Sequence, residues 1–244
     1  MLNMNTLSIK SLIQGVGSSF ERDLAIYNKS REGSSPTKDF AMSCLAIFYF
    51  KWPSLLTYEV QKSHKHIQDN LKNLFDLEKA PSDTQIRERL DEVEPSKLRA
   101  PFKTIFSMLQ RNKVLEEYVF MGEYYLASVD GTGLFSSQNV HCENCCVKNH
   151  KNETKTYYHQ MLGISIVHPN KKQVIPLAPE FNSKQDGHDK NDCERSAAKR
   201  LLADTRREHP HLKLIIVEDA LAANAPHIIP FPTTKYAINN CQLS

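Results

Sequence analysis

The hydrophobic pattern of this 244-residue chain changes near residue 119. Before that point apolar residues recur mainly at helical spacing, and the longest apolar stretch, residues 40–50, is bounded by Asp39 and Lys51. A membrane-spanning helix needs about 20 apolar residues, so this shorter stretch predicts a buried helix. After residue 119 the runs have the length and composition of strands. We therefore expect a helical region at 1–118, followed by a region that contains a sheet.

The helical region contains one clear helix start. Ser82 can accept hydrogen bonds from the first turn of a helix, and Gln85 three residues later completes a capping box. Arg87, Arg89 and Arg99 lie in or near the helices that follow, which could act as a helix-turn-helix on DNA. Acidic residues intervene, so a solvated amphipathic face is an equal alternative. Helices are expected at about 38–51, 54–75 and 96–110.

The second region reads as strand, strand, strand, helix, strand. The expected strands are 124–135, 156–169, 173–181 and 211–220, and the expected helix is 192–208. A helical crossover places the fourth strand parallel to an earlier one, here beside the first. The predicted fold is α+β, with a helical N-terminal region followed by a partial ribonuclease H-like mixed sheet at 119–228.

Two aspartates end predicted strands, Asp130 in VDGTG and Asp219 in VEDALAAN. If the first and fourth strands are neighbours, these carboxylates lie side by side and repel each other unless a cation neutralises them. Mg²⁺ prefers such oxygen ligands, and two ions about 3.5–4 Å apart can activate an attacking oxygen and stabilise a leaving one. The alternative is that each Asp only ends a strand, because Asp is common before turns.

A polar insert at 136–154 carries the run HCENCC followed by a further histidine. Cys142, Cys145, Cys146 and His150 are the candidate zinc ligands, with His141 beside them, because Cys-x₂-Cys is a common half of a tetrahedral zinc site. Such an ion would fold the insert rather than perform chemistry. The alternative is a loop with incidental cysteines, and His159 is read as a partly buried strand residue rather than a ligand.

Residues 84–228 resemble insertion-sequence transposases of the DDE type. The matching runs are SDTQIRERLDEV, SVDGTGLFSS, HCENCC, YYHQMLG, VIPLAPE, KNDCERSAAKRLL and HPHLKLIIVEDALAANAPHI. The resemblance implies a ribonuclease H-like catalytic domain in which two aspartates and a glutamate bind two Mg²⁺ ions, and it assigns the aspartates to Asp130 and Asp219. The implied reactions are hydrolysis at transposon ends and joining of the freed 3′-hydroxyl to target DNA.

The resemblance to the DDE-type transposases does not extend to their third metal-binding acid, the glutamate. The family's glutamate lies on a helix well after the second aspartate, whereas the 25 residues after Asp219 contain no Asp or Glu. Pro230 and Pro232 oppose a helix there. The tail at 229–244 is typical of out-of-register sequence, so we expect a C-terminally truncated transposase that is inactive alone. Glu218 is a poor substitute, because successive strand residues point to opposite faces.

Contacts to DNA phosphates are expected from Lys and Arg. The net charge of +3 does not by itself indicate a DNA-binding protein. The better basic cluster lies on the predicted helix 192–208, although a solvated helix face would have the same composition. Its members are Lys199, Arg200, Arg206 and Arg207.

The first 20 residues lack a cationic start followed by an apolar run, so no secretory signal is expected. A cytoplasmic, DNA-associated location follows, without a membrane partner. The expected partners are transposon-end DNA and either further copies of the chain or a full-length transposase. Three alternatives remain: a non-catalytic DNA-binding remnant, a zinc-stabilised interaction module, and an unrelated nuclease that takes a third acid from Glu180 or Asp189.

Overall fold

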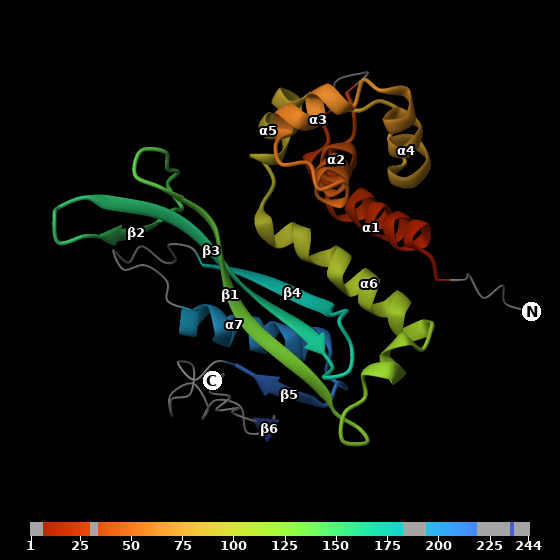
Figure 1. Ribbon diagram of the computed structural model, residues 1–244, viewed down its shortest axis with the longest axis vertical. Coiled ribbons are helices and arrows are strands. Elements are labelled where there is room, and N and C mark those ends of the chain that lie inside the picture. The colour runs from red at the N-terminus through yellow and green to blue at the C-terminus, as the bar shows by residue number, and fades with distance from the viewer. Residues whose placement is uncertain (1–6, 30–33, 183–193, 219–234, 237–244) are drawn as a thin grey trace, which may run out of the picture. The chain divides into compact units, whose positions relative to one another are not determined.

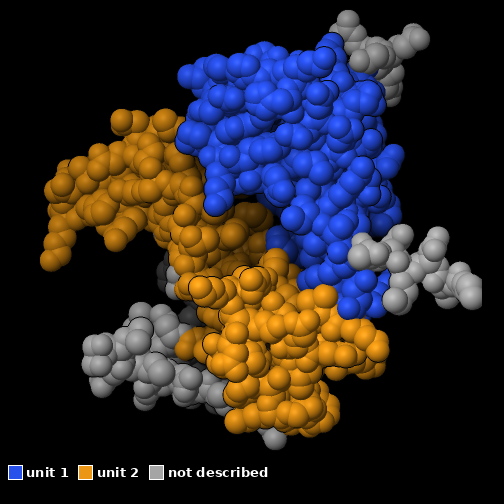
Figure 2. All heavy atoms as spheres, turned by 45° about the vertical axis from the view of Figure 1, so that its right-hand side comes forward, with its two compact units in different colours: residues 1–112 blue, residues 113–244 orange. Residues whose placement is uncertain are grey.

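The computed structural model describes residues 7–29, 34–182, 194–218 and 235–236. The chain divides into two compact units, Met1–Asn112 and Lys113–Ser244 (Figure 2). This division falls a few residues before position 118, where the hydrophobic pattern places it. The short 3-10 helix η3 (Val114–Tyr118) belongs to the second unit, and the hydroxyl of Tyr118 donates to the carbonyl oxygen of Gln173 at 3.3 Å.

The first unit is helical in its described residues, as the sequence predicts. The helical stretches predicted at 54–75 are two helices, separated where His64 adopts an extended backbone. The capping box of Ser82 and Gln85 is confirmed at the start of α5. The helices are α1 (Ile9–Asp23), η1 (Ala25–Tyr27), α2 (Thr37–Tyr49), α3 (Leu55–Gln61), α4 (Lys65–Phe75), α5 (Asp83–Leu90), η2 (Pro95–Arg99) and α6 (Ala100–Arg111).

Arg89 belongs to the interior of the helical unit and not to a DNA-facing surface. Its side chain is buried, and one terminal nitrogen donates to the carbonyl oxygen of Tyr27 at 2.8 Å and to the hydroxyl of Thr37 at 3.0 Å. The guanidinium also lies over the ring of Phe40. Arg89 therefore ties α5 to the segment that leads into α2.

Replacing Arg89 with Ala is expected to lower the free energy of unfolding of the helical unit by about 1–3 kcal/mol, because buried acceptors lose their donor. Urea unfolding followed by the fluorescence of Trp52, the single tryptophan, measures this change. The matched control is Arg87→Ala. Arg87 pairs with Asp83 on an exposed face, and such a pair contributes about 0–1 kcal/mol. An equal loss in both variants would contradict the structural role of Arg89.

The second unit contains a mixed sheet with one long helix, which establishes the α+β class (Figure 1). The described strands form a six-stranded sheet in the order β2-β3-β1-β5-β6. Strand β4 also pairs with β3, along residues 160–166, whereas β2 pairs with residues 155–158. The β1–β3 and β3–β4 pairs are antiparallel, and the β1–β5 pair is parallel as predicted. The elements are β1 (Tyr125–Ser137), β2 (Cys146–Asn149), β3 (Lys155–Val167), β4 (Ile175–Asn182), α7 (Glu194–Glu208), β5 (Leu214–Val217) and β6 (Lys235–Tyr236).

The first strand does not end at Asp130, where the sequence predicts its end. Strand β1 continues through the glycines to Ser137, and Gly131 and Gly133 pair with β3. The register shifts just after Gly133, so the glycines accompany a bulge rather than a turn. Beyond Asp130, β1 and β3 continue as a ribbon that curves away from the rest of the sheet (Figure 1). We call residues 131–161 the distal ribbon.

One face of the sheet is covered by α7. Leu162 and Ile164 are buried on this face, and Glu180, the register partner of Leu162, forms an ion pair with Arg200 of α7 at 2.7 Å. On the helix itself, Ala197 and Leu201 are fully buried. Because side chains alternate along a strand, Gly163 faces the opposite side of the sheet.

The atypical tail adds a short strand to the sheet. Lys235–Tyr236, within the tail that reads as out-of-register sequence, pair parallel with β5. Strand pairing is made by backbone groups, so an unusual sequence can still form it. Among the described residues, no helix is long and apolar enough to cross a bilayer.

Candidate metal-binding sites

Asp130 lies within β1 and not at its end. Its side chain is exposed, and one carboxylate oxygen accepts a hydrogen bond of 2.8 Å from the backbone N–H of Gly131. The buried neighbours Ala127 and Val129 alternate with it, so Asp130 faces away from α7. The carboxylate is therefore exposed on the face of the sheet opposite to α7.

The space beside Asp130 is open because its partner on β3 is a glycine. Asp130 and Gly163 are directly opposite in the antiparallel pair, so a side chain at position 163 would lie next to the carboxylate. A methyl group built at Gly163 would meet no atom within 4 Å. Among the described residues, the position next to the carboxylate is therefore open.

The second predicted aspartate, Asp219, lies outside the described residues. Strand β5 pairs with β1 up to Ser128 opposite Val217. The strand order that the acid-pair hypothesis needs is therefore present, with the fourth predicted strand parallel to the first. The predicted alternative third acid Asp189 also lies outside the described residues. Glu180 faces α7 through its ion pair with Arg200, on the side of the sheet opposite to Asp130.

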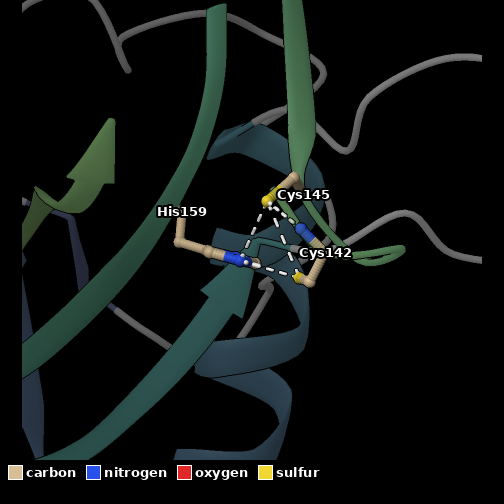
Figure 3. Close-up of side chains that lie close together, drawn as sticks. All are labelled: Cys142, Cys145 and His159. Carbon is tan, nitrogen blue, oxygen red and sulfur yellow. Dashed lines mark hydrogen bonds between the residues drawn. The ribbon is translucent and has the colours of Figure 1, made fainter. Parts of the chain in front are cut away.

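A second group of ligand atoms lies at the base of the Cys-rich loop. The thiol sulfurs of Cys142 and Cys145 are 3.6 Å apart, and each lies 3.2 Å from Nε2 of His159 (Figure 3). Among the described residues, Cys142, Cys145 and His159 form a group whose ligand atoms lie close enough together to hold a metal ion. Cys142 is exposed, Cys145 is buried and His159 is half-buried.

The backbone around the two thiols forms a tight turn. The N–H of Cys142 donates to the sulfur of Cys145 at 3.3 Å, and the N–H of Cys145 donates to the carbonyl oxygen of Cys142 at 3.2 Å. The ring of His141 stacks on the ring of Tyr157, with centroids 4.2 Å apart. This stacking and the turn hold the loop against β3, where His159 lies.

Cys146 and His150, predicted as ligands with Cys142 and Cys145, do not join this group. Cys146 begins β2 and its sulfur lies 3.9 Å from the carbonyl oxygen of Asn182. His150 follows the other end of β2, where Nε2 lies 2.8 Å from the hydroxyl of Thr156. Cys145 precedes β2 and its sulfur lies near Nε2 of His159, whereas Cys146 is the first residue of β2 and its sulfur lies near Asn182. No strand is predicted from the sequence in this insert.

His159 is the residue that sequence reasoning missed. It is a half-buried strand residue, as predicted, but its ring also meets the two thiols. It lies 14 residues after Cys145, and only the pairing of β2 with β3 folds the chain back to bring them together. The spacing Cys-x₂-Cys-x₁₃-His nevertheless falls within the range of zinc sites, so the sequence carried a signal for His159 that attention to the run HCENCC missed.

The predicted basic cluster is divided between structural and exposed roles. Arg200 is held by Glu180 and by the carbonyl oxygen of Phe181. Arg206 donates to the carbonyl oxygens of Pro210 and Leu212, which closes the turn between α7 and β5. Lys199 and Arg207 are exposed, and Arg207 also pairs with Asp204 at 2.8 Å. DNA binding by this helix would therefore depend on these two exposed residues.

No protein-family model and no curated protein matches the sequence.

Proposed function

We propose that the second unit carries the metal-dependent phosphoryl-transfer site of a DDE-type transposase, in which Asp130 and Asp219 hold Mg²⁺ at transposon-end DNA. The observation that carries this proposal is the parallel pairing of β1 with β5. Extending its register by two residues from Ser128 and Val217 leads to positions 130 and 219. Both residues are aspartates.

The connectivity of the sheet supports the same proposal. An antiparallel β1–β3–β4 set, a crossover by α7 and a parallel β5 beside β1 form the order expected of a ribonuclease H-like fold. In our proposal the carboxylates of Asp130 and Asp219 bind the ions, and the space beside Gly163 admits the DNA phosphate. The ions would activate the attacking oxygen and stabilise the leaving oxygen. Exposed Lys199 and Arg207 lie on α7, on the other side of the sheet from Asp130, so any contact that they make with a DNA backbone would be separate from the metal site.

Catalysis by these 244 residues alone is not expected. Two carboxylates repel each other unless cations neutralise them, and the family's third acid has no counterpart after Asp219. Glu180 is engaged by Arg200 on the far face of the sheet. We therefore propose metal and DNA binding by this chain, with strand joining only in the company of a full-length transposase.

The first test measures Mn²⁺, a spectroscopic substitute for Mg²⁺, by electron paramagnetic resonance. Asp130→Asn and Asp219→Asn are each expected to weaken Mn²⁺ binding at least tenfold, because each removes a charged ligand. The matched control is Asp204→Asn, which removes an aspartate of the same unit that pairs with Arg207. Equal Mn²⁺ affinity in all four proteins would contradict the two-aspartate site.

The second test is a strand-transfer assay with Mg²⁺ and duplexes that carry the matching transposon ends. The purified chain is expected to bind these duplexes without joining them. Robust joining that is lost in Asp130→Ala would uphold the phosphoryl-transfer site and overturn the proposed dependence on another chain.

A non-catalytic DNA-binding remnant is the second candidate, favoured by the absence of acids in the tail. It predicts salt-dependent DNA binding that is unchanged in Asp130→Asn and independent of Mn²⁺. A zinc-stabilised interaction module, favoured by the Cys142–Cys145–His159 cluster, predicts no DNA retention at any salt concentration.

A further inference from the structure

We propose that Cys142, Cys145 and His159 bind one Zn²⁺ ion, and that this ion holds the distal ribbon in its folded form. The site differs from the one that the local Cys and His motif predicts, because its third ligand comes from β3. It does not depend on the proposed role of Asp130.

The separations of the three ligand atoms suit a tetrahedral zinc ion. With Zn–S bonds of about 2.3 Å and Zn–N bonds of about 2.0–2.1 Å, tetrahedral geometry requires about 3.8 Å between two sulfurs and about 3.6 Å between sulfur and nitrogen. The observed separations are 3.6 Å between the sulfurs of Cys142 and Cys145 and 3.2 Å from each sulfur to Nε2 of His159. A shift of a few tenths of an ångström would admit the ion.

The chemistry of the three donors selects zinc over Mg²⁺. Two thiolates and an imidazole are soft or borderline ligands, whereas Mg²⁺ takes oxygen ligands. The N–H of Cys142, which donates to the sulfur of Cys145, would stabilise that thiolate in the manner of an outer-shell hydrogen bond. The ring of Phe135 lies 6.1 Å from the ring of His159 and supplies apolar surface next to the site. A fourth donor, such as water, would fill the remaining position.

The distal ribbon has a physical need for such an ion. Residues 132–136 of β1 and residues 138–144 of the following loop are all exposed. The ribbon consists of β1, β3 and the short β2, and a small sheet whose loop and β1 strand are exposed in this way has little apolar burial to stabilise it. Since ligands come together only in the folded ribbon, the free energy of zinc binding becomes folding free energy. The ion would join the loop to β3 at His159.

The composition test measures zinc in the purified chain by atomic emission, followed by Co²⁺ substitution. The expected result is one zinc per chain, and a Co²⁺ absorption spectrum with thiolate charge-transfer bands. Cys142→Ser and His159→Gln are expected to lose the metal. Cys146→Ser is the matched control, because its sulfur lies against the carbonyl oxygen of Asn182. Zinc retained in Cys142→Ser and His159→Gln, or absent from the native chain after reconstitution, would overturn the site.

The folding role has its own readout, which is trypsin cleavage of the ribbon at exposed Lys148 and Lys151. Removing zinc with a chelator is expected to accelerate cleavage there at least tenfold, and adding zinc back is expected to reverse the change. Cys146→Ser should behave as the native chain does. Zinc that binds and leaves the cleavage rate unchanged would overturn the folding role.

A third readout is alkylation. Burial raises the pKa of the Cys44 thiol to about 11, so Cys44 reacts slowly at neutral pH with or without metal. Cys142 is exposed and is expected to react rapidly in the zinc-free chain and at least tenfold more slowly with zinc bound. Equal reactivity of Cys142 in the two forms would contradict its assignment as a ligand.

Discussion

Replacing Ile164 with Ala is expected to lower the free energy of unfolding of the second unit by about 2–5 kcal/mol. Ile164 lies in the middle of β3 and is 1% exposed, on the face that α7 covers. Shortening the side chain removes apolar burial and leaves a cavity that the surrounding strands fill only in part. Hydrogen exchange of the β3 amides during urea unfolding measures the loss.

The control for this variant is Val174→Ala, at a position in the same unit that is 55% exposed. Its expected cost is within about 0.5 kcal/mol. The fluorescence of Trp52 reports on the helical unit, and an unchanged Trp52 transition would show that the loss is confined to the sheet. If Ile164→Ala and Val174→Ala cost the same, the assignment of Ile164 to the core would be wrong.

Replacing Gly163 with Leu is expected to leave stability nearly unchanged and to weaken Mn²⁺ binding at Asp130 at least tenfold. The new side chain meets no atom at its Cβ, and a glycine within a strand costs roughly 0.5–1 kcal/mol relative to Ala. Folding therefore has no steric reason to suffer. The leucine would instead occupy the space beside the carboxylate that the hydrated ion needs.

Gly163 and Ile164 are neighbours on β3 and face opposite sides of the sheet, so the two variants form a matched pair. Hydrogen exchange and Mn²⁺ resonance are measured on both proteins. Gly163→Leu should weaken Mn²⁺ binding and leave hydrogen exchange unchanged, whereas Ile164→Ala should accelerate hydrogen exchange. Normal Mn²⁺ affinity in a folded Gly163→Leu protein would contradict a metal site on the face opposite to α7.

Local signals predicted most of the elements. The apolar stretch gave α2, the Ser82–Gln85 pair located the start of α5, and continuous apolar residues gave β5. Each signal acts over a few residues, through backbone capping or burial of one face. Such signals suffice when a segment forms one element with one environment.

The failures arose where contacts distant in sequence decide the outcome. Gly131 and Gly133 favour a turn locally, but pairing with β3 holds them in a strand. His159 reads locally only as a strand residue, and the pairing of β2 with β3 brings its ring to the two thiols. By contrast, the parallel pairing of β1 with β5 was predicted correctly, because a strand that follows a helical crossover pairs parallel to an earlier strand.

Strand β3 contributes a residue to each of the two proposed metal sites, His159 to the zinc site and Gly163 to the space beside Asp130. His159 and Gly163 are four residues apart, so their side-chain positions share a face and lie about 13 Å from each other along an extended strand. A paramagnetic Co²⁺ bound at His159 would therefore broaden the nuclear resonance of the Gly163 amide. The broadening would give the distance from the metal at His159 to Gly163, and so locate the proposed Mg²⁺ site beside Asp130 relative to the proposed zinc site.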